Sequence, residues 1–500
     1  MDPTSPSVTR LANWINNQSQ ASLVAPSEAQ FLPVTTPLSG QLIAEVPLSQ
    51  AVDVNEAVSS AESAFPAWSS RTFKDRAQYL LRFHQTLAAH LDELAKLVVL
   101  EHGKTYEEAV GEIKKGLETL EYAISLPQLA TGRNLEVSRG VFCQDTRVPL
   151  GVVVSIVPFN FPFMVPFWTL PIAIGCGNTM VLKPSEKVPL TMDRVAQLAG
   201  TIFPPGVLSL VHGDKQVVPP LLEHSAVRAV TFVGTTHVAE LVSQQCRRLN
   251  KRCLALGGAK NHLVAAPDCD TELTAQDVVN SFTGCSGQRC MAASVLLTVG
   301  AQAELVASIV AKTVALQPGS GPREIGPVID EASRARILDY IVRSEQAGAE
   351  ILVDGRLNAA FTERAQASGG SWIGPTVIRH HHKTDVALHD EIFGPVLSIL
   401  ECPSGEAALE IENSNPYGNA ACIYTSSGAV AQHYTQRFRA GMIGVNIGVP
   451  VPREPFSFGG IEASKFGDMD ITGDGGIEFF TYRRKVTTKW GAPTEKSWLN

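Results

Sequence analysis

The chain has 500 residues, 44% of them hydrophobic and 18% charged, so it can bury more than one hydrophobic core, and two or three domains are expected. Its net charge of −8, with no run of lysine and arginine, argues against a nucleic-acid partner. A globular protein that acts on small molecules is the better expectation.

The first residues contain no recognisable targeting segment. Arg10 is the only basic residue before Arg71, and no apolar run accompanies it, so neither a signal peptide nor a transit peptide is expected. Nine cysteines at irregular spacing, without a CxxC pair, predict free thiols and no metal site. The long apolar stretch at 151–168 contains three prolines and Asn160, which argues against a membrane partner. We therefore expect a cytoplasmic protein.

From about residue 150 short β-branched runs alternate with helical stretches, as in βαβ units. Strands are expected at 152–157, 179–184, 206–211 and 229–234, and helices at 190–202 and 237–250. This alternation predicts a doubly wound α/β domain with a largely parallel sheet.

A second alternation follows residue 270. It comprises helices at 274–284, 305–316 and 333–348 and a strand at 442–448, and it predicts a second α/β domain. A strand pair at 134–152 and an exposed strand at 478–490 are expected to protrude. Protruding strands of this kind often pair with a partner subunit.

Two polar motifs stand where predicted strands end, which is where ligands bind in such sheets. VPFNFP at 157–162 presents the amide of Asn160 as a hydrogen-bond donor, although asparagine here is also a common turn former. LKPSE at 182–186 places Lys183 and Glu186 three residues apart, a spacing that can hold two ribose hydroxyls. By itself it also fits a surface turn.

Two further motifs are ambiguous in isolation. FVGTT at 232–236 puts a glycine and two hydroxyls at a strand–helix junction, which suits either a phosphate or a simple helix cap. DEIFGPV at 390–396 offers Glu391 and Phe393 before a Gly-Pro turn, and alone it is only a turn. The GxGxxG fingerprint of the commonest dinucleotide sites is absent from the sequence.

In this order, PFNFP, LKPSE, FVGTT, GGAKN, GQRC and EIFGP resemble the aldehyde dehydrogenase superfamily from about residue 20 to residue 490. PFNFPFMVPFW, GAKNH and GQRCMA are most similar to its methylmalonate-semialdehyde dehydrogenase branch, which releases its acyl product to coenzyme A. The resemblance implies an α/β fold of the aldehyde dehydrogenase type in three parts. These are a Rossmann-type NAD-binding domain at 1–133 and 153–261, an α/β catalytic domain at 262–460, and a β oligomerisation element at 134–152 and 475–500.

The resemblance also assigns the two cysteines of SFTGCSGQRCMAA at 281–293. Cys290 corresponds to the nucleophile, which forms a thiohemiacetal and, after hydride transfer to the nicotinamide, a thioester. Arg289 next to it favours the thiolate, whereas Cys285 is expected to be core. Asn160 and the backbone N–H of Cys290 would form the oxyanion hole.

The implied cofactor is NAD. Its contacts would come from Pro158, Phe159, Lys183, Glu186, Gly234, Thr235, Glu391 and Phe393. Glu186 beside the 2′-hydroxyl would repel an added phosphate, which favours NAD over NADP. Arg289 and Lys115 are the expected contacts of a substrate carboxylate, and no metal is expected.

The chain departs from the family pattern where hydrolytic members carry the water-activating glutamate of ELGGKNP. The corresponding residue is Leu256 or, with one gap, Ala255, and 241–267 contains no Asp or Glu. Thr235 stands where serine is usual, and Lys115 where the semialdehyde branch usually has arginine. Lys115 keeps the charge but loses the planar fork of arginine.

These features predict NAD-dependent oxidation of a short carboxylated semialdehyde, such as methylmalonate or malonate semialdehyde, by a homodimer or homotetramer with coenzyme A as co-substrate. One alternative is a hydrolytic NAD-dependent aldehyde dehydrogenase that yields a carboxylic acid. Another is a non-catalytic relative retained for binding or assembly, against which Cys290, Asn160 and Glu391 argue.

Overall fold

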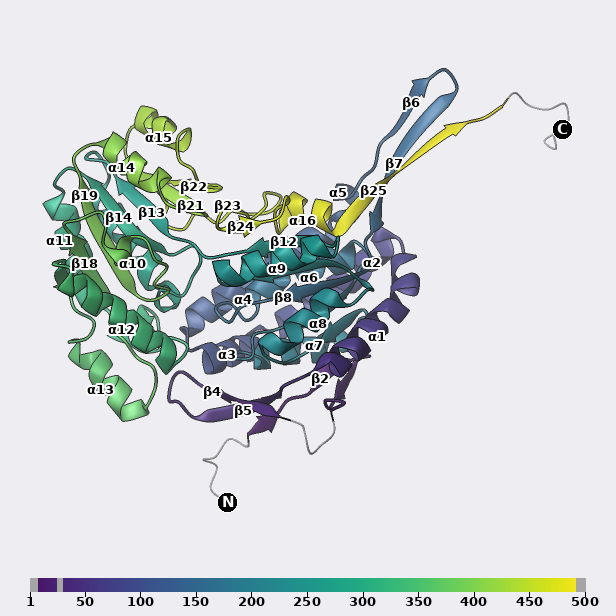
Figure 1. Cartoon of the computed structure of the whole chain (residues 1–500), viewed down its shortest axis with the longest axis horizontal. Coiled ribbons are helices and arrows are strands. Elements are labelled where there is room, and N and C mark those ends of the chain that lie inside the picture. The colour runs from purple at the N-terminus through teal and green to yellow at the C-terminus, as the bar shows by residue number, and fades with distance from the viewer. Residues whose placement is uncertain (1–7, 25–29, 492–500) are drawn as a thin grey trace.

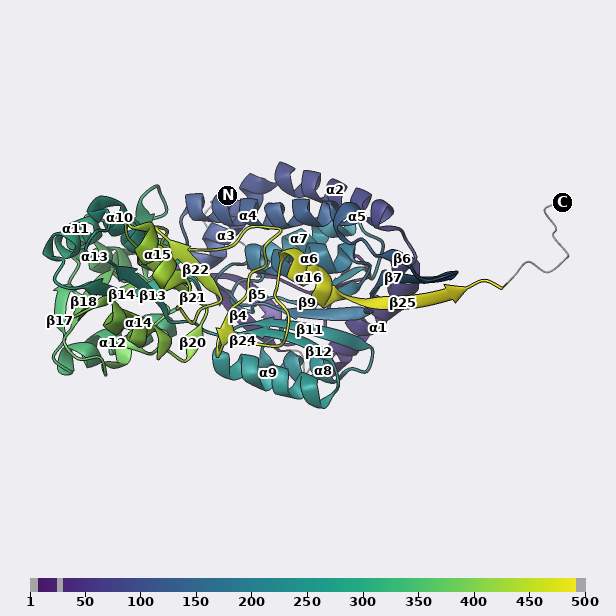
Figure 2. The ribbon, with the colours of Figure 1, turned by 90° about the horizontal axis from the view of Figure 1, so that it is seen from above.

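The computed structural model describes residues 8–24 and 30–491. Two bodies, each built around a β-sheet, lie side by side, and a long β arm projects from the end of the first body that is remote from the second (Figures 1 and 2). This arrangement agrees with the expected α/β class and with its two sheet-centred parts.

The first sheet has eight strands in the order β24-β12-β11-β8-β9-β10-β2-β3. Its five parallel strands are β8 (Val152–Ile156), β9 (Thr179–Lys183), β10 (Leu208–Leu210), β11 (Val227–Val233) and β12 (Arg252–Leu256). Antiparallel strands β2 (Asn13–Ile15), β3 (Gln18–Gln20) and β24 (Lys465–Phe466) extend it at the two edges. Because the chain runs outward from β8 in both directions, the strand order reverses between β8 and β11, which is where such sheets bind ligands.

Helices cover both faces of this sheet. One face carries α2 (Phe73–Ala89), α3 (Leu91–His102), α4 (Tyr106–Ile124), α6 (Met164–Gly175) and α7 (Leu190–Gly200). The other carries α1 (Ala51–Ser69), α8 (Val218–Glu223) and α9 (Thr236–Arg248). Because both faces are covered, β8 and β9 are buried along their whole length, which explains their continuous apolar runs.

The second sheet has seven strands in the order β17-β18-β19-β14-β13-β21-β22. Its parallel strands are β13 (Asn261–Ala265), β14 (Ala293–Val299), β18 (Thr376–His380), β19 (Val396–Cys402), β21 (Ala420–Tyr424) and β22 (Met442–Val445), and β17 (Glu350–Val353) is an antiparallel edge. Helices α10 (Thr271–Thr283) and α11 (Ala303–Val314) cover one face; α12 (Glu331–Gln346), α14 (Gly405–Asn413) and α15 (Gly428–Thr435) cover the other.

The arm is a three-stranded antiparallel sheet in the order β25-β7-β6. Strands β6 (Asn134–Ser138) and β7 (Val141–Pro149) form the expected pair, and β25 (Thr481–Lys489) joins them from the far end of the chain. The strand expected at 478–490 begins later, because residues up to Phe480 belong to helix α16 (Gly473–Phe480). Ile477, Phe479 and Phe480 are buried in the core of the first body, which holds that segment in the helix.

The remaining elements are short. They are β1 (Thr9–Arg10), β4 (Phe31–Thr35), β5 (Leu42–Pro47), α5 (Leu126–Leu129), β15 (Gln317–Pro318), β16 (Glu324–Ile325), α13 (Ala359–Ser368), β20 (Tyr417–Gly418) and β23 (Ile461–Glu462). Residues 1–7 of the expected NAD-binding domain and residues 492–500 of the expected oligomerisation element lie outside the described residues. Within the described ranges, no helix combines the length and the apolar character needed to cross a membrane.

Candidate active site

The loop that carries Cys290 is held in an unusual backbone conformation. Helix α10 ends at Thr283 and leads into a 3-10 turn, in which Cys285, Ser286 and Gly287 have φ angles of 51°, 56° and 71°. A Cβ atom at Gly287 would lie 2.1 Å from the carbonyl oxygen of Gly394, so only glycine fits. Non-glycine residues in this region cost about 1–3 kcal/mol each and persist at sites that need the geometry.

Two asparagine side chains fix the backbone at the nucleophile itself. Asn261 Nδ2 donates to the carbonyl oxygen of Cys290 at 2.7 Å, and Asn419 Nδ2 donates to the same oxygen at 3.0 Å. Neither role is predictable from the sequence: Asn261 is part of the GGAKN motif, whereas Asn419 follows a polar turn and belongs to none of the motifs.

Asn160 lies at the carboxyl end of β8, as its position in VPFNFP predicts. It is 4% exposed, and its Nδ2 donates to the carbonyl oxygen of Gln288 at 3.0 Å, next to the nucleophile loop. The backbone oxygen of Asn160 accepts a hydrogen bond from Lys104 Nζ at 2.8 Å. A side-chain amide has two N–H groups, so one stays available for a ligand oxygen near Cys290.

A cavity of about 400 Å³ unites most of the predicted site residues. It is lined by Pro158, Phe159, Asn160, Val165, Trp168, Val233, Gly234, Thr235, Gly257, Gly258, Cys290, Ser333, Arg336, Glu391 and Phe393. The residues that the sequence analysis missed include Ser333 and Arg336, which come from α12 of the second body and have no motif around them. Lys183, Glu186, Arg289 and Lys115 lie outside this lining.

The start of helix α9 is suited to a phosphate. Thr235 is the residue that precedes the helix, and its side chain makes no capping hydrogen bond. Thr236 Oγ1 instead accepts the backbone N–H of Gly258 at 2.8 Å, which ties the helix start to the segment after β12. The first backbone N–H groups of a helix have no intrahelical partner, so they and the Thr235 hydroxyl can serve an anion.

Lys183 and Glu186 form an ion pair beside the cavity. Lys183 ends β9, its Nζ lies 2.9 Å from Glu186 Oε2, and its carbonyl accepts from the N–H of Val157, which leads into Pro158. Burial alone would raise the pKa of Glu186, but the Lys183 ammonium holds it below its ordinary value. A negative charge therefore stands at neutral pH where the sequence analysis expects the ribose.

Glu391 and Phe393 approach from the other body. Glu391 Oε1 accepts the N–H of Ala259 at 3.1 Å, and burial raises the pKa of Glu391 to about 7. Burial also lowers the pKa of neighbouring Lys260 to about 7, and among the described atoms its Nζ has no hydrogen-bond partner. Phe393 has a φ of 53° and meets the ring of Phe159 edge-on at 6.0 Å, closing one wall.

The two cysteines of the loop differ in their surroundings more than in their pKa. Burial raises the pKa of each thiol to about 12, and the Glu391 carboxylate adds to the effect at Cys290. Cys290 lines the cavity, whereas Cys285 is 4% exposed and its N–H donates to Glu108 Oε1 at 2.6 Å. Of these two cysteines, only Cys290 is therefore placed to contact a ligand in the cavity.

Leu256 and Ala255 are the two candidates for the position of the usual glutamate. Leu256 is buried in the same hydrophobic cluster against which Cys290 packs, whereas Ala255 is buried in the cluster on the opposite face of the sheet. The correspondence of Leu256 to the glutamate stays a prediction. Glu391 is the one carboxylate among the described residues that line the cavity.

Arg289 and Lys115 are both engaged by other groups. Arg289 Nη2 donates to the carbonyl oxygens of Asn280 at 2.6 Å and Ser281 at 3.0 Å, near the end of α10. Lys115 Nζ contacts Glu454 Oε2 at 2.8 Å and Glu118 Oε2 at 3.1 Å. A contact with a substrate carboxylate stays a prediction for both residues.

Comparison with known proteins agrees with this geometry. Residues 24–486 match the aldehyde dehydrogenase family. Malonate-semialdehyde dehydrogenase 1 of Geobacillus thermodenitrificans is 43% identical over 492 residues, which cover 97% of this chain and 99% of that protein.

Solved structures are similar over nearly the whole chain. The methylmalonate-semialdehyde dehydrogenase of Oceanimonas doudoroffii superposes with a TM-score of 0.93 at 36% identity, covering 97% of this chain and 99% of its own. A Sinorhizobium meliloti protein described as a methylmalonate-semialdehyde dehydrogenase, solved with NAD, gives 0.93 at 33% identity, covering 98% of this chain and 100% of its own. The chain therefore belongs to the aldehyde dehydrogenase family.

Proposed function

We propose that the chain is an NAD-dependent aldehyde dehydrogenase that oxidises a short carboxylated semialdehyde, such as methylmalonate or malonate semialdehyde, through a thioester on Cys290 and passes the acyl group to coenzyme A. The observation that carries this proposal is the cavity that joins Cys290 and Asn160 to the strand ends of a dinucleotide-type sheet. The names of the similar proteins, malonate- and methylmalonate-semialdehyde dehydrogenase, support the choice of aldehyde.

The cofactor contacts follow from the arrangement of the site. Gly234 and Thr235 at the start of α9 would hold the pyrophosphate, and Lys183 with Glu186 the adenosine ribose. Pro158 and Phe159 would pack against the cofactor, while Glu391 and Phe393 would position the nicotinamide ribose. The charge on Glu186 supports NAD over NADP, and the similar Sinorhizobium protein was solved with NAD.

The chain's own residues would carry the acyl chemistry. The Cys290 thiol would first lose its proton to solvent; the thiolate Sγ would then attack the aldehyde carbon, and the new C–O⁻ group would accept hydrogen bonds from Asn160 Nδ2 and the N–H of Cys290. Removal of one such donor typically costs about a hundred- to a thousandfold in turnover. Bound NAD supplies the hydride acceptor that turns the adduct into a thioester.

The choice between water and coenzyme A as the acceptor of the acyl group depends on whether the site holds a base that activates water. Water is a far weaker acid than a thiol, whose pKa is about 8.5, so hydrolysis needs a base far more than thiol exchange does. The family resemblance puts Leu256 in the place of the usual base, and Leu256 is an apolar residue buried in the cluster against which Cys290 packs. The hydrolytic alternative has one observation in its favour, since Glu391 lines the same cavity with a pKa of about 7 and could activate water.

The remaining assignments are also proposals. Arg289 and Lys115 would attract the substrate carboxylate, each at the expense of contacts it already makes. The arm, whose Leu135 and Val137 are more than half exposed, would join subunits into a homodimer or homotetramer. The cytoplasm is the proposed compartment.

Substitution of the nucleophile tests the proposed chemistry. In stopped-flow mixing with NAD and malonate semialdehyde, Cys290→Ala is expected to form no NADH, because Cys290 is the one cysteine among the described residues that line the cavity, while its affinity for NAD is retained. Cys285→Ala, the matched control in the same loop, should keep most of the burst. A full burst of NADH from the Cys290 variant would remove the assignment.

A further inference from the structure

One face of helix α4 contacts both loops of the proposed site. Glu108 accepts the N–H of Cys285 at 2.6 Å, and Glu112 accepts the N–H groups of Phe163 at 2.7 Å and Met164 at 3.1 Å. Lys115 and Thr119 continue this series at intervals of three and four residues. Residues so spaced share one face of a helix, so Lys115 lies in line with the groups that hold the loops of Cys290 and Asn160.

The ammonium of Lys115 is already taken by a carboxylate from a distant part of the chain. Its Nζ lies 2.8 Å from Glu454 Oε2, and Thr119 Oγ1 donates to Glu454 Oε1 at 2.9 Å. The side chains of Lys115 and Glu454 are 16% and 9% exposed, so solvent screens this pair only in part. Glu118 contacts the same Nζ at 3.1 Å but is 38% exposed.

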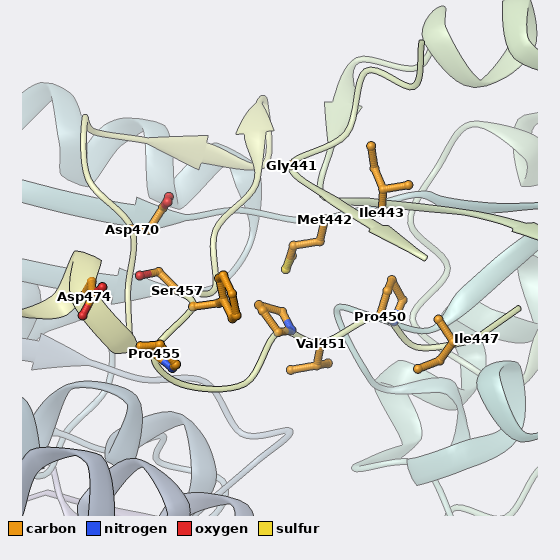
Figure 3. Close-up of a pocket in the computed structure, with 12 residues that line it drawn as sticks. Gly441, Met442, Ile443, Ile447, Pro450, Val451, Pro455, Ser457, Asp470 and Asp474 are labelled. Atoms are coloured by element: carbon orange, nitrogen blue, oxygen red, sulfur yellow. The ribbon is translucent and has the colours of Figure 1, made fainter. Parts of the chain in front are cut away.

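Glu454 belongs to a chain segment that forms part of the wall of a second groove. The residues that line this groove differ from those that line the cavity at Cys290. The groove has a volume of about 640 Å³ and is lined by Gly441, Met442, Ile443, Ile447, Pro450, Val451, Pro452, Pro455, Phe456, Ser457, Asp470 and Asp474. Figure 3 shows Asp470 and Asp474 at one end and Ile447 and Pro450 at the other. Pro452 and Pro455, which line it, flank Glu454 closely in the chain.

The groove is linked to the nucleophile loop through Asn419. The N–H of Met442, a groove residue, donates to the carbonyl of Asn419, whose side chain holds the carbonyl of Cys290. Val451 and Cys290 both pack against one hydrophobic cluster. Glu454 therefore connects the segment that lines the groove to the face of α4 that carries Lys115 and that holds the loops of Cys290 and Asn160.

We propose that Glu454 is a specificity-determining residue of this site: its carboxylate occupies the ammonium of Lys115 that a substrate carboxylate would otherwise contact, and so sets how strongly the enzyme prefers carboxylated over uncharged aldehydes. The inference rests on the proposed function. A substrate carboxylate must share Lys115 with Glu454, and Glu454 also repels it. An uncharged aldehyde meets neither effect.

Glu454→Gln tests the inference, because the amide keeps the shape and can still accept from Thr119 while the charge is lost. We expect the KM for malonate semialdehyde to fall about three- to tenfold, the range for one partly screened charge at contact distance. The KM for propanal, which has the same number of carbons, should stay within about twofold. Steady-state NADH formation at saturating NAD and coenzyme A gives both values.

Matched variants separate this role from a merely structural one. Glu118→Gln removes the more exposed carboxylate on Lys115 and should give a smaller change in the same direction. Adding Lys115→Met to the Glu454→Gln variant should abolish the gain, since the freed ammonium is then absent. Thermal unfolding checks that each variant is folded, and Glu454→Ala repeats the test if the glutamine variant is unstable.

The outcomes are distinguishable from failure of the proposed function. If the wild type oxidises neither aldehyde with NAD, the proposed function is wrong. The inference is overturned if the wild type is active but the folded Glu454 variants keep the wild-type ratio of the two KM values. It is also overturned if the KM for malonate semialdehyde rises relative to the KM for propanal.

Discussion

The surroundings of Cys290, and not a low pKa of its thiol, support its assignment as the nucleophile. Burial raises the pKa of Cys285 and of Cys290 alike to about 12. What separates them is the cavity, the amide of Asn160 beside the loop, and the carboxylate of Glu391. In the absence of ligands the thiol of Cys290 is thus protonated at neutral pH, and the Glu391 charge contributes to that state.

Glu391→Gln should therefore lower the pKa of Cys290 and speed its alkylation by iodoacetamide without NAD. Each pKa unit lost raises the thiolate fraction about tenfold while the thiol is mostly protonated. Because the pKa of Glu391 is about 7, the wild type and the variant should differ above pH 7 and converge below it, where the carboxyl is neutral. Mass spectrometry of the Cys290 peptide across pH 6 to 9 measures this.

Asp390→Asn is the control for that measurement, since Asp390 accepts the hydroxyl of Tyr340 and does not line the cavity. Equal alkylation rates in the wild type and the Glu391 variant at pH 9 would mean that the carboxylate does not act on the thiol.

Among the elements of the fold, the sequence predicts the strands and helices that have a regular hydrophobic pattern. It does not predict the strained backbone of the turn at 285–287. The largely apolar, β-branched runs at β8, β9 and β11 and the amphipathic helices between them are visible because their pattern is local. The left-handed turn at 285–287 has no such signal, since two of its three residues are not glycine. The start of β25 was placed too early because an apolar segment ending at Phe480 reads equally as strand or buried helix.

The loop that carries Asn160 is held by a buried ion pair, which the sequence periodicity also cannot predict. Lys104 Nζ lies 2.6 Å from Glu112 Oε2 with both side chains fully buried, and it also holds the carbonyl of Asn160. Lys104→Met leaves the Glu112 carboxylate without its cation, so the free energy of unfolding should fall by about 3–5 kcal/mol. Urea unfolding measures the loss.

Lys96→Met, which breaks an exposed pair with Asp92 in α3, is the matched control and should leave the urea midpoint unchanged. A loss for the Lys104 variant no greater than for this control would show that the buried pair does not stabilise the loop.

For the whole molecule, the family and the α/β fold predicted from the motifs are confirmed. The motifs identify the strand ends, and a reversal of strand order then brings Asn160 and Gly234 together. The contributions of α12 to the cavity, Ser333 and Arg336, were not predictable, because they depend on how one body is placed on the other. The domain boundaries stay a prediction. Strand β24 (Lys465–Phe466), which follows the expected catalytic domain in the chain, pairs with β12 of the first sheet.

The arm is the part of the molecule whose exposure calls for a partner subunit. Leu135 and Val137 of β6 are 59% and 54% exposed, and Val137 lies at an irregularity in the pairing of β6 with β7. Val137→Asp should shift the mass measured by light scattering at micromolar concentration toward the monomer, because a charge there cannot be buried unpaired. Glu136→Gln, which alters a side chain that is already polar, should not. A monomeric wild type would contradict the oligomerisation proposal.

The central claim is that coenzyme A, and not water, releases the acyl group from Cys290. It is tested by mixing the wild type with NAD and malonate semialdehyde and following NADH and product with and without coenzyme A. With Leu256 in the place of the usual base, we expect one burst of NADH followed by slow turnover when coenzyme A is absent. With coenzyme A, turnover should be fast and acyl-CoA should form in proportion to NADH. Rapid, sustained turnover to a free carboxylate without coenzyme A would contradict the account and favour hydrolysis assisted by Glu391.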